Sequence, residues 1–386
     1  MQRHLITPRP DLAARLQERG MLYHEGYYAE TSAYQLTANE VDRLDAATNE
    51  LFEMCLSVVR HVIEHELWDE FCIPRAHAEL IKRSWREDDV SLYGRFDLGY
   101  DSRTGDLKLL EFNADTPTAL LEAAVVQHDW LRSAGRPDQW NSLHERLVGH
   151  LRACRAELSA DAAGGIDLHL ACARDSAEDY MTVAYLAECA RQAGYTTRLL
   201  YVDEISVDSN QGNRFCAPDG QPIRHLFKLY PWEWLLREEF AEYLAPNYET
   251  TTWIEPPYKA ILANKMLLVY LWKLFPGHRL LLESHYVPAT DPGAYAGAWC
   301  RKPVLGREGQ NTSIVEDGQV LEARDGEYGA EGFVLQRFFP IETFDGWLPV
   351  LGAWVVAGEA AGLGIREQPQ SLITDNLAQF APHWFS

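Results

Sequence analysis

Gly94-Arg-Phe-Asp97 and Leu110-Glu-Phe-Asn-Ala-Asp-Thr116 are the stretch of this chain that decides its fold. Residues 102–106 between them are polar and contain a glycine, a composition that favours a tight reversal. The flanking segments Tyr93–Tyr100 and Leu107–Asn113 therefore predict an antiparallel hairpin.

This hairpin gathers polar side chains on one face. Strand side chains alternate between faces, so Arg95 lies beside Asp97, and Glu111 beside Asn113. One register pairs Asp97 with Glu111 and Arg95 with Asn113, and opposed like charges are destabilising unless something neutralises them. Carboxylate and amide oxygens suit Mg²⁺, which usually keeps waters and substrate phosphates as further ligands. The pattern thus predicts a magnesium site, and the alternative is a solvated polar face on an ordinary hairpin.

Composition excludes several classes of protein. The 386 residues are 47% hydrophobic and 24% charged, which is enough for a substantial core in two or more lobes. A formal net charge of −22 argues against a nucleic-acid partner, because no basic stripe could displace counterions from phosphates. It gives weak support for a cationic substrate.

No segment predicts secretion or a membrane span. The start of the chain is polar, and the longest apolar stretch, residues 260–275, contains Lys265 and Lys273. The seven cysteines show no Cys-x-x-Cys spacing, so we expect reduced thiols in a cytoplasmic protein. The sequence leaves the oligomeric state open.

Periodicity predicts the organisation around the hairpin. Residues 39–66 read as a helix with Asn39 as N-cap, and residues 118–153 as a second helical stretch. A strand at 166–173, a helix at 177–192 and a strand at 196–202 form a β-α-β unit, which implies a parallel sheet. Because no Gly-x-Gly-x-x-Gly follows its first strand, this unit is assigned to the substrate side.

A second region, Arg301 to Thr312, suggests phosphate binding. A strand that carries Lys302 runs into a glycine-containing loop with Gly309, whose backbone N–H groups could face phosphate oxygens. An ordinary turn is the alternative. Lys265 lies in an apolar helical pattern, where a surface lysine extending its ammonium to water is the usual case.

Three later positions complete the candidate set. Phe333–Pro340 is an apolar strand broken by proline, and as an edge strand it could offer backbone groups to a purine. Arg366 lies among apolar strand residues, where it needs an anionic partner. Glu233 stands between two tryptophans, a setting that suits a cationic amine, although a glutamate that merely starts a helix is the alternative.

Together these pieces resemble the synthetase portion of the glutathionylspermidine synthase family, a branch of the ATP-grasp superfamily, from about Met21 onward. The motifs that carry the resemblance are Gly94–Asp97, Glu111–Asp115, Ile261–Lys265, Lys302–Gly309 and Gly364–Ile373. The resemblance implies an α/β protein (α+β lobes) with an ATP-grasp fold, an inserted β-α-β unit like a pre-ATP-grasp domain and a helical N-terminal region. The expected divisions are 1–160, 161–255 and 256–386.

The resemblance also implies roles for single residues. It makes Asp97, Glu111 and Asn113 the magnesium ligands and Arg95 the residue that stabilises charge at the reacting centre. It places Thr116, Arg307 and Arg366, with Glu233 on the amine side, near the substrates. The residues it places around ATP are Arg95, Lys265, Lys302, Gly309, Gln336, Arg337, Phe338, Phe339, Ser371, Leu372 and Ile373.

The implied activity is an ATP- and Mg²⁺-dependent carboxylate–amine ligase. ATP would phosphorylate a carboxylic acid or peptide, and a small amine would attack the acyl phosphate to give an amide, with segment 302–318 closing against water. Two departures from the family stand out: no room for an N-terminal amidase domain, and Thr116 where the family has serine, which puts glutathione in doubt. The alternative is a nucleotide-binding or regulatory protein that makes no amide.

Overall fold

The predicted hairpin forms one edge of a five-stranded sheet. The computed structural model describes residues 1–22, 26–158, 167–291, 295–369, 371–373 and 378–386. Strands β3 (Tyr93–Asp101) and β4 (Asp106–Asn113) form the hairpin in the predicted register, with Asp97 opposite Glu111 and Arg95 opposite Asn113. The sheet order is β18-β17-β16-β3-β4, so β3 is joined to β16 (Trp347–Val356), which pairs in turn with β17 (Glu359–Pro369).

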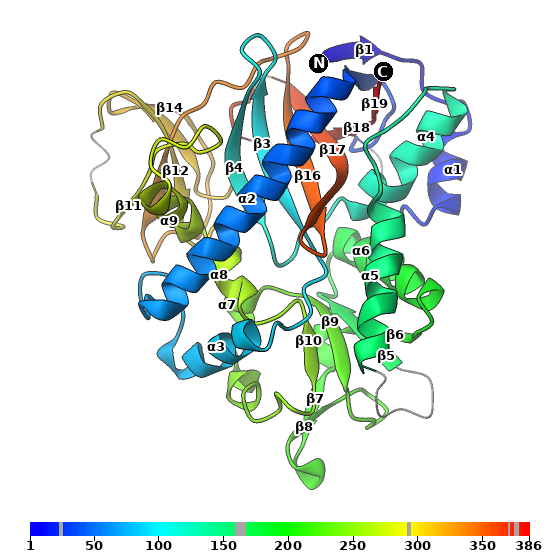
Figure 1. Ribbon diagram of the computed structural model, residues 1–386, viewed down its shortest axis with the longest axis vertical. Coiled ribbons are helices and arrows are strands. Elements are labelled where there is room, and N and C mark those ends of the chain that lie inside the picture. The colour runs from blue at the N-terminus through cyan, green and yellow to red at the C-terminus, as the bar shows by residue number, and fades with distance from the viewer. Residues whose placement is uncertain (23–25, 159–166, 292–294, 370, 374–377) are drawn as a thin grey trace.

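Helices pack on both faces of this central sheet (Figure 1). The long helix α2 (Ala38–Glu64) crosses one face, and the predicted heptad positions Leu44, Leu51 and Val58 are all buried there. Its N-cap is Thr37, not Asn39 as predicted, because Thr37 and Glu40 form a reciprocal capping box. Helix α5 (Leu143–Leu158) covers the other face.

The predicted helical stretch 118–153 is broken. A π-helical turn at Glu122–Val126 continues into α4 (Gln127–Ser133), and α5 begins only at Leu143. Gly135, with φ of +60°, and the following proline end the first part, since proline removes a backbone donor and restricts the residue before it.

A second antiparallel sheet, ordered β11-β15-β12-β13-β14, stands beside the hairpin (Figure 1). Strand β15 (Phe333–Arg337) lies between β11 (Ser284–Val287) and β12 (Ala298–Pro303), so the prediction that 333–340 is an edge strand is wrong. The predicted strand that carries Lys302 and the loop after it are confirmed as the end of β12 and a loop at 304–312, and β13 (Ser313–Glu316) follows, so the segment 302–318 is only partly loop.

The predicted β-α-β unit is confirmed in a four-stranded parallel sheet, β10-β9-β5-β6, at the end of the molecule opposite the termini (Figure 1). Strands β5 (Asp167–Cys172) and β6 (Thr196–Tyr201) flank α6 (Ala177–Gln192), whose bounds match the prediction. Strand β9 (His225–Leu229) leads into the short helix α7 (Trp232–Leu235). The carboxyl ends of these strands lie near the hairpin, which positions them for the site.

The remaining elements complete a mixed α/β fold, as predicted. Strands β1 and β2 form a small sheet with β19, so the two ends of the described chain lie together. In the part of the chain that the structure describes, no helix is both long and apolar enough to cross a membrane. The other elements are β1 (Gln2–Leu5), α1 (Leu12–Glu18), β2 (Ser32–Leu36), α3 (Ala78–Arg86), β7 (Ser206–Asp208), β8 (Arg214–Cys216), β10 (Thr252–Ile254), α8 (Lys259–Leu262), α9 (Met266–Leu274), β14 (Gln319–Ala323), β18 (Gln379–Ala381), β19 (His383–Phe385) and short 3₁₀ turns at 75–77, 202–204, 209–211 and 239–243.

The three predicted divisions stay a prediction. The central sheet joins strands from two of them, because β16 comes from the third division and pairs with β3 of the first, and β17 adds to the sheet through β16.

Candidate functional site

A cavity of about 530 Å³ opens where the hairpin, the second antiparallel sheet and the parallel sheet meet. Every residue predicted for the site lies in its lining except Ser371. The predicted residues that line it are Arg95, Asp97, Glu111, Asn113, Thr116, Glu233, Lys265, Lys302, Arg307, Gly309, Gln336, Arg337, Phe338, Phe339, Arg366, Leu372 and Ile373.

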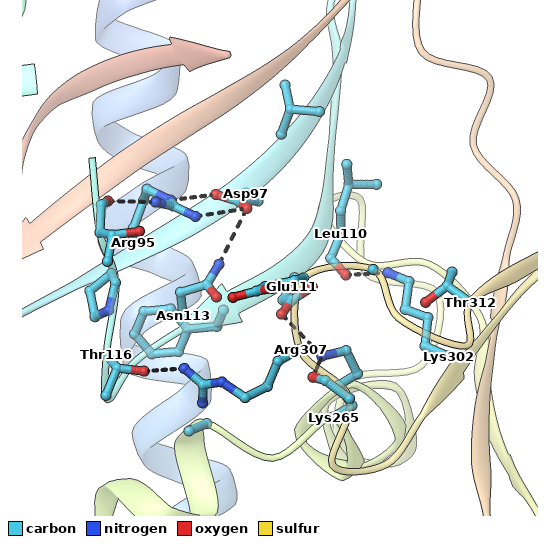
Figure 2. Close-up of a pocket in the computed structure, with 18 of the residues that line it drawn as sticks. Arg95, Asp97, Leu110, Glu111, Asn113, Thr116, Lys265, Lys302, Arg307 and Thr312 are labelled. Atoms are coloured by element: carbon cyan, nitrogen blue, oxygen red, sulfur yellow. Dashed lines mark hydrogen bonds and ion pairs between the residues drawn. The ribbon is translucent and has the colours of Figure 1, made fainter. Parts of the chain in front are cut away.

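Asp97 is held between two arginines. Arg95 donates to its carboxylate over 2.7 and 3.2 Å, and Arg366, from β17, donates over 2.7 Å (Figure 2 shows the Arg95 contacts). Burial opposes ionisation, but the two guanidinium charges outweigh it and hold the pKa of Asp97 below its ordinary value. Arg366 therefore has the anionic partner that its position predicted.

A glycine makes room for this arrangement. Gly352 of β16 lies opposite Asp97, and a Cβ there would come within 3.0 Å of the Arg95 side chain. A larger residue would push the guanidinium away from the carboxylate.

Glu111 has a different counterion. Lys265 donates to its carboxylate over 3.1 Å and also to the backbone oxygen of Gly306. Burial again opposes ionisation, and the charges of Lys265 and Lys302 hold the pKa of Glu111 below its ordinary value. Lys265 is 8% exposed and lies at the N-cap of α9, between α8 and α9, so the expectation of a surface lysine within a helix is wrong.

The donor set of the hairpin fits a magnesium ion. Two ionised carboxylates stand opposite each other, and Asn113, which donates its amide to Asp97 over 3.2 Å, retains an oxygen that can bind a metal. No group of three His, Cys, Asp or Glu side chains with metal-site geometry occurs among the described residues. A magnesium ion would therefore take its remaining ligands from Asn113, water or phosphate, and it would compete with Arg366 and Lys265 for carboxylate oxygens.

Lys302 points into the cavity with neutral partners. Its ammonium donates to the backbone oxygen of Leu110 over 2.8 Å and to the side-chain oxygen of Gln336 over 2.8 Å (Figure 2 shows the Leu110 contact). Gln336 also donates to the backbone oxygen of Leu109 over 3.0 Å, which fixes its orientation. The positive charge of Lys302 is therefore available to an anionic ligand.

The segment from Gln336 onward has fewer free backbone groups to offer a ligand than predicted, because neighbouring strands pair with it. Within β15, Gln336 is opposite Ser284 on one side and Cys300 on the other, and the amide of Phe338 donates to Ala298 over 3.0 Å. Phe338 and Phe339 reach the cavity where the chain leaves the sheet.

Thr116, Arg307 and Glu233 meet at one side of the cavity. Arg307, from the loop 304–312, donates to Thr116 over 2.5 Å and contacts Glu233 at 3.4 Å (Figure 2 shows the Thr116 contact). Burial raises the pKa of Glu233, and Arg307 opposes that rise. The loop is thus linked both to the segment that follows the hairpin and to α7.

Ser371 lies apart from the cavity lining. Its hydroxyl donates to Glu322 of β14 over 2.6 Å, and the amide of Leu372 donates to the same carboxylate over 2.8 Å. Ser371 therefore ties its segment to the second antiparallel sheet, while Leu372 and Ile373 reach the cavity.

An acidic wall of the cavity was missed by the sequence analysis. Asp175, just before α6, and Glu178 and Asp179, in its first turn, line the cavity. Burial and the charge of Glu178 raise the pKa of Asp179 to about 6. Ligands bind beyond the carboxyl ends of parallel strands, so acidic residues directly after the strand at 167–172 were a usable signal.

The comparisons with known proteins agree with this geometry. The family model described as "Glutathionylspermidine synthase preATP-grasp" matches residues 3–386. A Haemophilus influenzae protein named "Putative acid--amine ligase" is 38% identical over 98% of this chain and 97% of its own length.

A trypanothione synthetase of Crithidia fasciculata is 27% identical over 81% of this chain, which corresponds to 50% of that protein. Among solved structures, a glutathione synthetase-like effector from Globodera pallida superposes with a TM-score of 0.55 at 11% identity, covering 92% of this chain and 89% of the other. That likeness shows the fold, which is of the ATP-grasp type seen in glutathione synthetase-like proteins.

Proposed function

The chain belongs to the glutathionylspermidine synthase family, and on that premise we propose that it is an ATP-dependent acid–amine ligase that forms an amide through an acyl phosphate and releases ADP and phosphate. The observation that carries the proposal is the opposed pair of ionised carboxylates, Asp97 and Glu111, in one cavity with Lys302, whose ammonium donates to neutral oxygens. A carboxylate pair near a lysine that is not in a direct ion pair suits a metal-bound triphosphate.

The cations of the cavity define its phosphate side. Lys265 comes from the start of α9 and Lys302 from the second sheet, and the loop with Gly309 also lines the cavity. We assign the triphosphate of the substrate ATP to this side and its adenine to the stretch Gln336–Phe339. The apolar pair Leu372 and Ile373 would cover the nucleotide from the opposite segment.

Magnesium, when bound by Asp97, Glu111 and Asn113, would neutralise phosphate oxygens and favour transfer of the terminal phosphoryl group. With magnesium bound, Arg366 would no longer be needed by Asp97. Its guanidinium could then bind the acid substrate's carboxylate with two parallel hydrogen bonds. Arg95 stays at the reacting centre, where it stabilises the oxyanion that develops as the amine attacks.

The amine is assigned to the acidic wall. Asp175, Glu178 and Asp179 line the cavity, and their negative charge suits a cationic amine. Glu233 also lines the cavity and is already paired with Arg307. It can therefore accept an amine only when Arg307 moves to another partner, such as the acid substrate.

The loop 304–312 would exclude water from the acyl phosphate. Arg307 already links this loop to Thr116 and Glu233. Which acid is used stays open: Thr116 adds a methyl group relative to serine, and such a change in a pocket alters discrimination by only about 1–3 kcal/mol.

The test is a screen for ADP release from Mg-ATP that needs two further substrates. Glutathione and small peptides are offered as acids, polyamines and amino acids as amines, and products are identified by mass spectrometry. An amide that forms in step with ADP, and only when both partners are present, supports the ligase. Nucleotide binding without such turnover over the whole panel favours a regulatory protein.

A further inference from the structure

A buried ion pair joins the cavity lining to the parallel sheet: Asp115 is a lining residue, and Lys228 lies on β9. Asp115 and Lys228 have side chains that are each 2% exposed, and the lysine donates to the carboxylate over 2.5 Å. Neither residue was assigned a role in binding or catalysis. Lys228 also lies 4.6 Å from the centre of the Trp232 ring.

The pair fixes a turn of the backbone. Asp115 accepts a hydrogen bond of 2.7 Å from the amide of Trp232, and Lys228 donates over 2.9 Å to the backbone oxygen of Tyr230. One end of the turn 230–232 is thereby bound directly to Asp115, and the other end is bound to it through Lys228. Glu233 is the next residue along the chain from this turn, and Thr116 is the next residue after Asp115.

These contacts close a ring. Thr116 contacts Arg307, Arg307 contacts Glu233, and the chain returns through Trp232 to Asp115. Thr116 directly follows Asp115, and Asp115 binds the amide of Trp232, which precedes Glu233, so the buried pair joins the two segments that Arg307 bridges. The loop 304–312 therefore contacts, through Arg307, two segments that the buried pair joins.

We propose that Asp115 and Lys228 are positioning residues that hold Thr116 and Glu233 at the separation Arg307 spans, and so set the position of the loop 304–312 over the substrates. The substrate part of this inference rests on the proposed ligase function, whereas the effect on the loop does not. Replacing a buried ion pair by apolar residues often costs no stability, so an ion pair with two backbone contacts is better explained by positioning than by stability alone.

The first experiment measures amide hydrogen exchange without any substrate, so it is independent of the ligase assignment. In Asp115→Asn we expect exchange of residues 304–312 to rise roughly tenfold, with little change in α2 and the central sheet. The matched control is Glu30→Gln, which removes the charge of another buried carboxylate, paired with Arg9 far from the cavity. Exchange in its loop 304–312 should equal that of the wild type.

Lys228→Gln provides a second variant in case Asp115→Asn does not fold, since it keeps a hydrogen-bond donor and removes the buried charge. It should raise exchange in the same loop. An unchanged loop in either folded variant overturns the proposal, and so does a rise spread evenly over the chain, because the pair would then only stabilise the fold.

The second experiment uses the acid and amine found in the screen. In both variants the KM values of the acid and the amine should rise about tenfold while the KM of ATP stays within twofold, because ATP lies on the other side of the cavity. A rise in the KM of ATP alone, or a fall in kcat with all three KM values unchanged, contradicts positioning of the substrate side. If no substrates are found, the exchange experiment still decides the role of the pair.

Discussion

Asp97 and Glu111 at the wall of the cavity are held differently from Asp115 and Glu255, whose side chains are 2% and 0% exposed. Asp97 pairs with Arg95 and Arg366, and Glu111 pairs with Lys265, so each of these cations is a side chain. Asp115 and Glu255 also pair with lysines, but each accepts hydrogen bonds from backbone amides as well. A side chain can turn towards a ligand, whereas a backbone amide in a packed core cannot. The wall carboxylates are thus suited to exchange partners, and the buried ones to hold the scaffold.

The largest expected effect comes from a change in the wall carboxylates, which are suited to exchange partners. Asp97→Asn keeps the size of the side chain but removes the charge that binds a metal, so turnover should fall at least roughly 100-fold. Circular dichroism and thermal unfolding should remain close to those of the wild type, and the affinity for Mn²⁺ should drop in parallel with activity. Asp101→Asn, on the same hairpin but paired with Arg103 outside the cavity, is the control. Unchanged turnover in Asp97→Asn would remove the metal assignment.

The second prediction concerns a change in the buried carboxylates, which hold the scaffold. Glu255 accepts from the amides of Leu92 and Tyr93 over 3.0–3.1 Å and pairs with Lys259, and it is fully buried. Glu255→Gln leaves Lys259 without a buried counterion, so the free energy of unfolding should fall by about 3 kcal/mol. Urea unfolding measures this loss. Nucleotide affinity below the unfolding temperature should not change, and a loss of nucleotide binding in the folded variant would contradict the distinction between the two sets.

A third prediction concerns a carboxyl group that lies beside another acid. Burial, with the charge of Glu178, raises the pKa of Glu122 to about 7. The folded state then binds a proton that the unfolded state releases, so this group's contribution to stability is complete below about pH 4.5 and is lost as pH rises through 7. Between pH 5 and 8 the loss should be about 2 kcal/mol.

Glu122→Gln tests the sign of this effect. The variant should lack that part of the pH dependence when urea unfolding is compared at pH 5 and pH 8. An equal decline in the variant and the wild type would show that Glu122 is not the group that titrates. The wall carboxylates, whose pKa values are lowered, act in the opposite sense: their contribution to stability is complete at neutral pH and is lost only at acidic pH.

The sequence predicted local pairing better than contacts between distant elements. The hairpin register follows from side-chain alternation and turn composition, which lie within about twenty residues, and so it was confirmed. The position of β15 inside a sheet depends on β11 and β12, which are far from it along the chain, and the edge-strand prediction was wrong. The broken helix at Lys265 was missed for the same reason.

The site shows the same division. Periodicity and motifs identified the residues around the cavity, but not their partners. That Arg366 contacts Asp97, and Arg307 contacts Thr116 and Glu233, depends on β17 and the loop 304–312 reaching the hairpin. Asp115 is part of the motif Glu111–Asp115, yet its partner Lys228 lies 113 positions further along the chain. Nothing local in the sequence therefore indicated the buried pair.

The smallest predicted effect sharpens the comparison among lysines. Lys228 and Lys259 face carboxylates, whereas Lys302 donates to the neutral oxygens of Leu110 and Gln336. An ammonium that is not in a direct ion pair gains one when a phosphate binds, so Lys302→Met should weaken ATP binding about tenfold, or about 1.4 kcal/mol. Isothermal titration calorimetry with Mg-ATP measures this change.

Lys108→Met is the matched control for Lys302→Met. Lys108 lies on the same hairpin strand that carries Glu111, and it too donates to backbone oxygens, those of Arg279 and Leu281, but it does not line the cavity. If both variants weaken ATP binding equally, the charge of Lys302 does not act on the nucleotide directly. If only Lys302→Met does so, and the deficit shrinks as salt is raised, the lost interaction is electrostatic, as an ammonium facing a phosphate requires.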